Sequence, residues 1–325
     1  MRLTSLILLA ATAIATPTPA DLAHELTRRQ ASEACPIGYC TQNGGTTGGA
    51  AGSTVTVSNL ADLTEAAESE EPLTIIVSGS ISGSAKIRVA ADKTIYGASG
   101  SSITGIGFYI RRTSNVIMRN LKISKVDADN GDAIGIDAST NVWVDHCDLS
   151  GDLSGGKDDL DGLLDISHGA EWVTVSNTYF HDHWKGSLIG HSDNNEDEDL
   201  GALHVTYANN HWYNVFSRTP LIRFATVHII NNYWDSLIDT GVNCRMDAQV
   251  LIQSSAFHNC PDRAIFFADS DYTGYAVVQD VDLGGSSNSV PTGTLTPSSL
   301  PYAAIPALGS GNVGTIIPGT AGQKL

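Results

Sequence analysis

Six segments of this chain resemble one another and recur every 22 to 32 residues. Each has valine at its second position and ends in a large apolar residue. A minimum spacing near 22 residues with longer insertions is typical of a solenoid, in which one structural unit stacks on the next. The segments are residues 115–123, 141–149, 172–180, 204–212, 226–234 and 249–257, with Val116, Val142, Val173, Val205, Val227 and Val250 at the second position.

The repeated unit has the residues of a β-strand. Alternation within each segment places valine inward, and the content of Thr, Val, Ile and aromatic residues favours strands over helices. Four segments also carry asparagine four residues after the valine, where the amides could stack as a ladder: Asn120, Asn177, Asn209 and Asn231. We predict an all-β fold, a right-handed single-stranded parallel β-helix. A β-sandwich is the alternative, because it also has short strands at regular spacing.

The segments that flank the repeats differ from them. Residues 60–69 have apolar residues at helical spacing, which predicts a short helix that caps the N-terminal end of the stack. Residues 285–325 are rich in Ser, Gly, Pro and Thr, so we expect an irregular segment along the outside, with a disordered tail as the alternative. We predict that residues 33–325 form a single domain.

The N-terminus has the pattern of a signal peptide. Arg2 precedes an apolar run over residues 6–15 that small residues follow, and this run is too short to span a membrane. We predict a signal peptide over residues 1–20. Arg28-Arg29 either ends a short pro-segment at about residue 29 or is a solvated pair. The protein is therefore expected to be secreted and extracellular, without a membrane partner, and a monomer is the simplest expectation.

Charge and cysteine content narrow the function classes. The formal net charge is −17, whereas a nucleic-acid binder shows a basic face. A polyanionic substrate would need local attraction from a few Lys and Arg residues or from a bound cation.

Secretion permits disulfides, and five cysteines leave at least one unpaired. Local pairing favours Cys35–Cys40 and Cys244–Cys260, with Cys147 as a buried apolar residue.

Charged residues recur at the spacing of the coils. Asp132, Asp161, Lys185, Arg218 and Arg245 are separated by 29, 24, 33 and 27 residues. Neighbouring parallel strands lie about 4.8 Å apart, so these side chains would line one face over roughly 20 Å. The sequence therefore predicts a charged site on the outer wall of the solenoid.

The acidic members of this set have the residue types of a calcium site. Asp161 and Asp165 lie four apart in a strand and would face one groove, and Asp132 or Asp129 could supply a third carboxylate. Calcium prefers such oxygen ligands, although ordinary solvated aspartates are the alternative. We interpret the further acidic residues at 193 and 196–199 as a solvated loop.

Several motifs of this chain resemble the pectate lyase family, in its extracellular fungal branch. They are NVWVDHCDLS (141–150), DGLLDIS (161–167), WVTVSNTYFHDHWKGSLIGHSD (172–193) and SRTPLIRF (217–224). The resemblance implies that Asp132, Asp161 and Asp165 bind Ca²⁺, and that Lys185 and Arg223 bind substrate carboxylates. It also implies that Arg218 is the catalytic base and that Arg245 is a further substrate contact. Lys185 and Arg223 would assist Arg218 in catalysis.

The implied reaction is calcium-dependent β-elimination. Its substrate would be (1→4)-α-D-galacturonan, as polygalacturonate or low-methyl pectin, and its products 4,5-unsaturated oligogalacturonides. Pectin lyases of the same fold prefer methylated chains and carry an arginine in place of the calcium carboxylates, so Asp161 and Asp165 favour the unmethylated substrate. One departure is Asn130, where the family often has an acidic residue. A glycoside hydrolase and a non-catalytic polysaccharide-binding β-helix are the other readings.

Overall fold

A computed structural model describes residues 26–325 of the chain. The predicted signal peptide at residues 1–20 lies outside the described residues. Arg28 and Arg29 fall in a helical segment, residues 26–31, that begins the described part. Within the described residues, none of the helices has the length and apolar character needed to cross a membrane.

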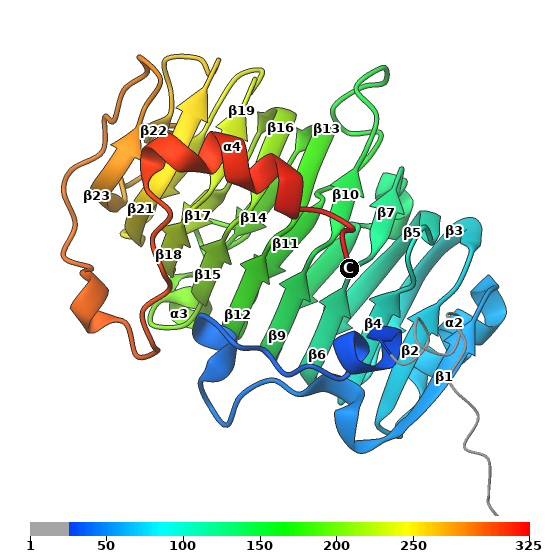
Figure 1. The fold of residues 1–325 in the computed structure, drawn as a ribbon. Coiled ribbons are helices and arrows are strands. Elements are labelled where there is room, and N and C mark those ends of the chain that lie inside the picture. Colours follow the sequence, from blue (N-terminus) through cyan, green and yellow to red (C-terminus); the bar gives the residue numbers. More distant parts are fainter. Residues whose placement is uncertain (1–25) are drawn as a thin grey trace, which may run out of the picture.

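The chain winds into a stack of coils whose strands form three parallel sheets (Figure 1). One sheet carries the candidate site and is called the groove sheet: β3 (Ser80–Val89), β5 (Ser102–Arg111), β8 (Ile134–Asp137), β11 (Leu164–Ser167), β14 (Ser187–Ile189), β17 (Leu221–Arg223), β20 (Val242–Arg245) and β22 (Ile265–Phe266). The long sheet contains β1 (Ser53–Val57), β2 (Leu73–Val77), β4 (Lys93–Gly97), β6 (Ser114–Arg119), β9 (Thr140–Asp145), β12 (Glu171–Ser176), β15 (His204–Ala208), β18 (Thr226–Ile230), β21 (Gln249–His258) and β23 (Tyr275–Asp282). The third sheet contains β7 (Lys122–Ser124), β10 (Asp148–Ser150), β13 (Tyr179–Lys185), β16 (His211–Ser217) and β19 (Tyr233–Asp235), and the ends of β5 and β21 join it. This is the predicted parallel β-helix, and the β-sandwich is excluded.

The predicted repeat sets the register of the core. The six repeated valines are opposite one another in consecutive strands of the long sheet and are fully buried. The large apolar residues that end the segments are also paired from coil to coil in the third sheet, where Trp234 stacks on Phe257 with ring centroids 4.1 Å apart. Apolar side chains therefore pack on apolar side chains from one coil to the next over these six coils.

The repeated asparagine marks a bend between two sheets. Asn120, Asn177, Asn209 and Asn231 all have positive φ, between 48° and 59°, a conformation that asparagine tolerates better than most residues. The predicted amide ladder forms in one place, where Asn231 Nδ2 donates to Asn209 Oδ1 at 3.0 Å. The four positions thus share a backbone conformation, while their amides mostly bond to different partners, such as Gly97 O for Asn120 and Asp145 Oδ1 for Asn177.

Helices and short 3₁₀ turns cover the ends and the outside of the stack. Helix α2 (Leu60–Glu68) packs on β1 to β3 with Leu63 and Ala67 fully buried, and so confirms the predicted cap. Helix α3 (Glu196–Asp199) lies in a loop. The 3₁₀ turns are η1 (Tyr39–Thr41), η2 (Gly48–Ala51), η3 (Ala128–Asn130) and η4 (Pro297–Ser299).

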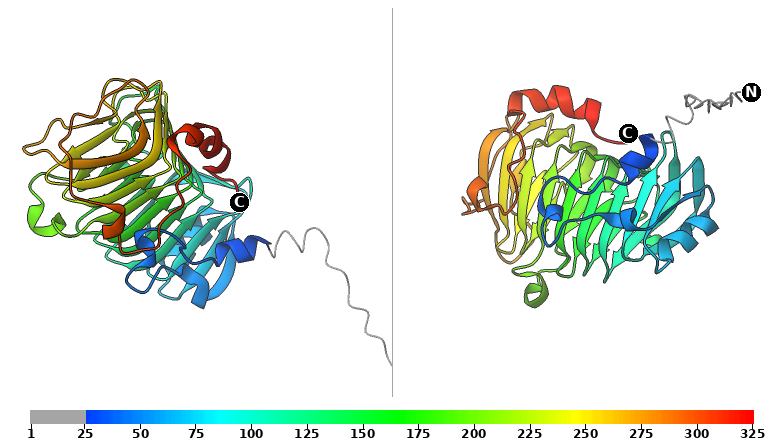
Figure 2. Two further views of the ribbon diagram at one scale, coloured as in Figure 1. Left: turned by 60° about the vertical axis from the view of Figure 1, so that its left-hand side comes forward. Right: turned by 60° about the horizontal axis from the view of Figure 1, so that its bottom comes forward.

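The C-terminal segment predicted to lie along the outside of the coils, residues 285–325, does so (Figure 2). The expectation that it is irregular throughout is wrong, because it contains helix α4 (Ser310–Thr320). Val313 and Ile317, one turn apart, are buried against Ala256. Beyond the helix, Leu325 N donates to Asn120 Oδ1 at 3.0 Å, and Gln323 Nε2 donates to the carbonyl of Asn120 at 2.9 Å. We refer to residues 283–325 as the C-terminal strap.

One of the two predicted disulfides is present. Cys35 and Cys40 are bonded, and Cys147 is a buried free cysteine as predicted. The predicted Cys244–Cys260 bond is wrong, since both residues are free. Cys244 points from β20 into the core, whereas Cys260 lies in the loop that follows β21, where Cys260 Sγ is 3.3 Å from the His258 carbonyl oxygen.

Candidate active site

Two of the three predicted calcium-binding carboxylates face one point on the outer side of the groove sheet. Asp132 lies in the turn before β8 and Asp165 lies on β11. Asp132 Oδ1 accepts a hydrogen bond from Gly162 N at 3.0 Å, and Asp165 Oδ1 accepts one from Leu188 N at 2.9 Å. A Cβ atom on Gly162 would lie 2.5 Å from Asp165 Oδ1 and 2.8 Å from Asp132 Oδ1. The lack of a side chain at Gly162 therefore lets the two carboxylates approach.

Asp161, the third carboxylate, is turned toward a lysine. Its Oδ1 lies 3.3 Å from Lys185 Nζ. Within residues 26–325, no three His, Cys, Asp or Glu side chains form a ready metal site. Asp129, the other candidate, is exposed, and the Asn130 amide is held against earlier coils by donating to Ser84 Oγ at 2.9 Å.

The carboxylate cluster, defined as Asp132, Asp161 and Asp165, is electrostatically unfavourable. Burial, followed by the charges of Asp165 and Asp161, raises the pKa of Asp132 well above its usual value. Burial also raises the pKa of Asp165 to about 6, although Arg218 opposes this shift. Asp132 and Asp165 are largely buried, the Asp161 side chain is 42% exposed, and the three carboxylates repel one another. Their oxygen atoms fit a hard divalent cation, because its charge would offset both the burial and the repulsion.

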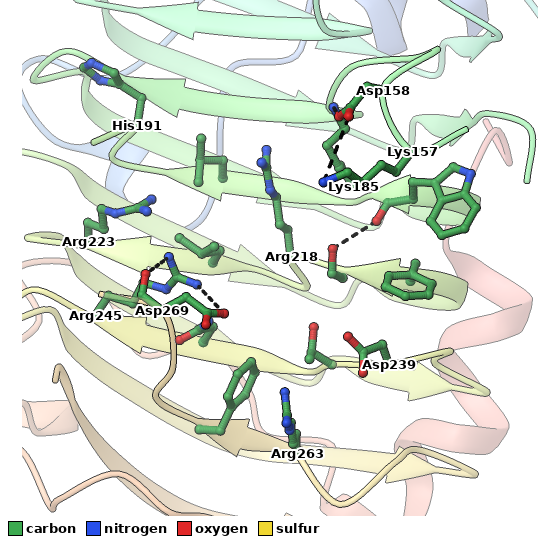
Figure 3. A pocket seen from close by; sticks show the side chains of 18 residues that line it. Lys157, Asp158, Lys185, His191, Arg218, Arg223, Asp239, Arg245, Arg263 and Asp269 are labelled. Carbon is green, nitrogen blue, oxygen red and sulfur yellow. Dashed lines mark hydrogen bonds and ion pairs between the residues drawn. The ribbon is translucent and has the colours of Figure 1, made fainter. Parts of the chain in front are cut away.

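Lys185 and Arg218 lie directly beside the carboxylate cluster. Lys185 ends β13, and its Nζ also lies 3.4 Å from Asp158 Oδ1. Arg218 follows β16 with a φ of 59°, and its backbone carbonyl accepts a hydrogen bond from Ser187 N. The Arg218 side chain is 31% exposed, and Nη1 is 3.9 Å from Asp165 Oδ2. Figure 3 shows the Arg218 side chain between Lys185 and Arg223, pointing into the groove.

Arg223 and Arg245 are adjacent, because β17 and β20 pair them directly. Arg245 is therefore in register with Arg223 and not with Arg218. Arg223 Nε forms an ion pair with Asp193 Oδ1, so the prediction that the acidic run is simply solvated is wrong at this residue. Arg245 Nη1 donates to the carbonyl of Asp269 at 2.9 Å, and burial together with the charge of Arg223 lowers the pKa of Arg245.

A groove of about 380 Å³ joins these cations, and the carboxylate cluster lies at its edge. Trp184 and Phe216 form one wall, with ring centroids 4.8 Å apart. The sequence did not point to either ring. A signal was present, because Trp184 precedes Lys185, Phe216 precedes Ser217, and β13 and β16 pair Lys185 with Ser217. Other lining residues that the sequence did not suggest are Lys157, Asp158, Asn243, Arg263 and Asp269.

Comparison with known proteins identifies the family. The family model described as pectate lyase matches residues 4–266. This chain belongs to the pectate lyase family. It is 90% identical to pectate lyase plyB of Emericella nidulans over 100% of both chains, and 55% identical to pectate lyase B of Colletotrichum gloeosporioides over 92% of this chain and 88% of that protein.

The fold agrees with a solved member of this family. A crystal structure of a pectate lyase from Bacillus sp. N165 in complex with trigalacturonate has a TM-score of 0.80 and 31% identity, covering 89% of this chain and 98% of that chain. The family resemblance seen in the sequence is thus confirmed, and so is the enzyme class, a polysaccharide lyase. Membership of the pectate lyase family rules out the alternative interpretation of this chain as a glycoside hydrolase.

Proposed function

We propose that this pectate lyase family member cleaves unmethylated (1→4)-α-D-galacturonan by calcium-dependent β-elimination. The observation that carries the proposal is the position of the carboxylate cluster beside Lys185 and Arg218, at the edge of a cationic groove. A protein of net charge −17 repels a polyanion over most of its surface, so a substrate with one carboxylate per sugar would be held at this groove.

Asp132, Asp161 and Asp165 would hold the Ca²⁺ ion. When bound, the ion would withdraw electron density from the substrate carboxylate and make the C5 proton of the same sugar more acidic. Lys185 now pairs with Asp161 and would then be released to donate to the substrate. A methyl ester has no negative charge for these groups to bind, which supports the unmethylated chain as the substrate.

The elimination itself would depend on three basic residues. Arg218, with its guanidine in the neutral form, would take the C5 proton, and the electrons of the C5–H bond would become the C4–C5 double bond as the C4–O4 bond breaks. The leaving O4 would keep the bonding pair and take a proton from solvent, so no water is added across the broken bond, unlike glycoside hydrolysis. Lys185 and Arg223 would stabilise the negative charge that builds up on the substrate carboxylate, and Arg245 would bind a neighbouring sugar.

A digestion experiment tests this function. Purified protein is incubated with polygalacturonate, with and without a calcium chelator, and the unsaturated product is followed by its ultraviolet absorbance. We expect absorbance to rise only when calcium is present, and Asp165→Asn to reduce kcat/KM by at least ~100-fold. The matched control is Asp152→Asn, which removes a 39% exposed carboxylate that pairs with Lys125 and is not part of the carboxylate cluster.

Two results would contradict the proposal. Full activity in the chelator would exclude a calcium role for the carboxylate cluster. New reducing ends without ultraviolet absorbance would identify hydrolysis.

We also propose secretion after removal of residues 1–20, with residues 33–325 as a single catalytic domain that acts as a monomer. Intact mass and N-terminal sequencing of protein from culture medium test the cleavage site. Light scattering tests the oligomeric state, and a dimer would contradict the proposed monomer.

A further inference from the structure

The outer face of the groove sheet continues past the carboxylate cluster toward the N-terminal coils. Asp165 is paired with Gly135, Gly135 with Tyr109, and Tyr109 with Arg88. Side chains in one register of a parallel sheet point to the same face, and three coils at about 4.8 Å extend that face by roughly 14 Å. Figure 1 shows β3 and β5 at the end of the stack opposite β22, next to which the groove lies.

This N-terminal part of the face carries a connected set of basic and aromatic side chains. Lys86 Nζ lies 4.2 Å from the centroid of the Tyr109 ring, and Arg111 Cζ lies 5.7 Å from the same centroid. Arg88 Nη2 contacts the carbonyl of Arg111 at 3.5 Å. Tyr109 is itself fixed, because its hydroxyl donates to Asp137 Oδ2 at 2.9 Å. We call Lys86, Arg88, Tyr109 and Arg111 the basic platform.

The basic platform and the carboxylate cluster form one surface, because glycines separate them. A Cβ atom on Gly135 would lie 3.1 Å from Asp132 Oδ2 and 3.5 Å from Tyr109 Cδ2. A Cβ atom on Gly131, next to Asp132, would lie 3.1 Å from Lys86 Nζ. No side chain at either position therefore stands between the cluster and the platform.

Two of the three cations of the basic platform form no ion pair within the described residues. Of its three cations, Arg111 alone forms an ion pair within residues 26–325, with Asp137 at 3.4 Å. Lys86 and Arg88 are exposed on either side of buried Ile87. These two cations are therefore available to an anionic ligand, in a protein with only 18 Lys and Arg residues.

Acidic residues define where the surface ends. A second cavity, of about 660 Å³, is lined by Arg88, Arg111 and Arg112 together with Glu68 and Glu70. A polyanion that follows the groove sheet would meet these glutamates after the platform, and they would repel it.

We propose that the basic platform binds additional galacturonate units of the polymer, on the side of the carboxylate cluster away from Arg245. Lys86 and Arg88 pair with sugar carboxylates, and Tyr109 holds Lys86 in position. The bound chain then spans both halves of the face, so long substrates gain contacts that short ones cannot make. This inference rests on the proposed function and extends its substrate contacts.

The test compares substrate lengths in a double variant. Lys86→Ala/Arg88→Ala is assayed on long polygalacturonate and on trigalacturonate, by ultraviolet absorbance at low and moderate salt. We expect the ratio of kcat/KM on the polymer to kcat/KM on the trimer to fall about five- to tenfold at low salt, since two surface charge contacts are lost. The fall becomes smaller as salt rises, because added ions screen these contacts.

The matched control is Lys122→Ala/Lys125→Ala. It removes two cations with 46% and 59% exposed side chains at β7, on another face, and changes the net charge equally. A ratio in the double variant that equals the control ratio overturns the proposal. Arg88→Gln, which truncates one exposed side chain, repeats the test if the double variant is unstable. If wild-type protein forms no unsaturated product from either substrate, the proposed function itself has failed.

Discussion

We expect a buried histidine on the long sheet to make the stability of this protein sensitive to acid. His228 is 2% exposed on β18, where Nδ1 lies 2.8 Å from the hydroxyl of Tyr302 and Nε2 lies 3.0 Å from Gln253 Oε1. Tyr302 belongs to the C-terminal strap. Burial lowers the pKa of His228 from 6.5 to about 4, although the Gln253 hydrogen bond opposes this shift.

The size of the effect follows from the shift in this pKa. The folded chain holds His228 neutral, while the unfolded chain protonates it below about pH 6.5. The contribution of His228 to the free energy of unfolding is therefore complete above about pH 6.5 and is lost as the pH falls toward 4. One pKa unit corresponds to about 1.4 kcal/mol, so going from about pH 7 to pH 4.5 removes about 2 to 3 kcal/mol of the free energy of unfolding.

The assay compares wild type with His228→Gln, which removes the titrating group. Urea unfolding is followed by tryptophan fluorescence at about pH 7 and about pH 4.5 for both proteins. We expect wild type to lose about 2 to 3 kcal/mol more than the variant between the two conditions. His258→Gln is the control, because the His258 side chain is 59% exposed. Equal losses in wild type and His228→Gln would refute the reasoning.

Three other substitutions test the site and the core. Arg218→Lys should lower kcat/KM by about 10²- to 10⁴-fold at neutral pH in a folded protein, because Arg218 is the proposed base, and activity close to wild type would remove it from that role. Asp193→Asn, which breaks the ion pair to Arg223, should raise KM about fivefold with a smaller change in kcat, whereas an unchanged KM would show that Arg223 needs no such support. Trp234→Ala should lower the free energy of unfolding by about 3 to 5 kcal/mol, because Trp234 is fully buried on Phe257 and donates to the carbonyl of Thr219. A loss below about 1 kcal/mol in chemical denaturation would contradict this packing account.

The part of the fold that repeats could be predicted from the sequence. Each coil is built on its neighbours, so a valine that recurs in one slot is opposite the valines before and after it. The same register places Asp132 opposite Gly162 and beside Asp165. The proximity of these two carboxylates could therefore be predicted, because they lie on or next to neighbouring strands of the stack.

The part that does not repeat could not be predicted in this way. Arg223 finds its partner, Asp193, in a long loop whose path no periodicity fixes. Cys244 and Cys260 are 16 residues apart in the sequence, which favoured a disulfide between them. The Cys244 side chain on β20 is instead buried in the core. Helix α4 contains Pro318 and three glycines, and its stability comes from packing against Ala256 and not from intrinsic propensity.

The end of the C-terminal strap has a consequence for how the stack comes apart. In an array whose units touch only their neighbours, unravelling can start at one end and proceed coil by coil. Here the backbone N–H of Leu325 donates a hydrogen bond to Asn120, 205 residues earlier, while helix α4 packs on β19 and β21. The C-terminal strap thus connects early and late coils. A terminal coil that begins to unfold is therefore held by contacts with coils far from it. Such a molecule should unfold in one cooperative transition. Removing the contacts of the C-terminal strap should divide that transition into two.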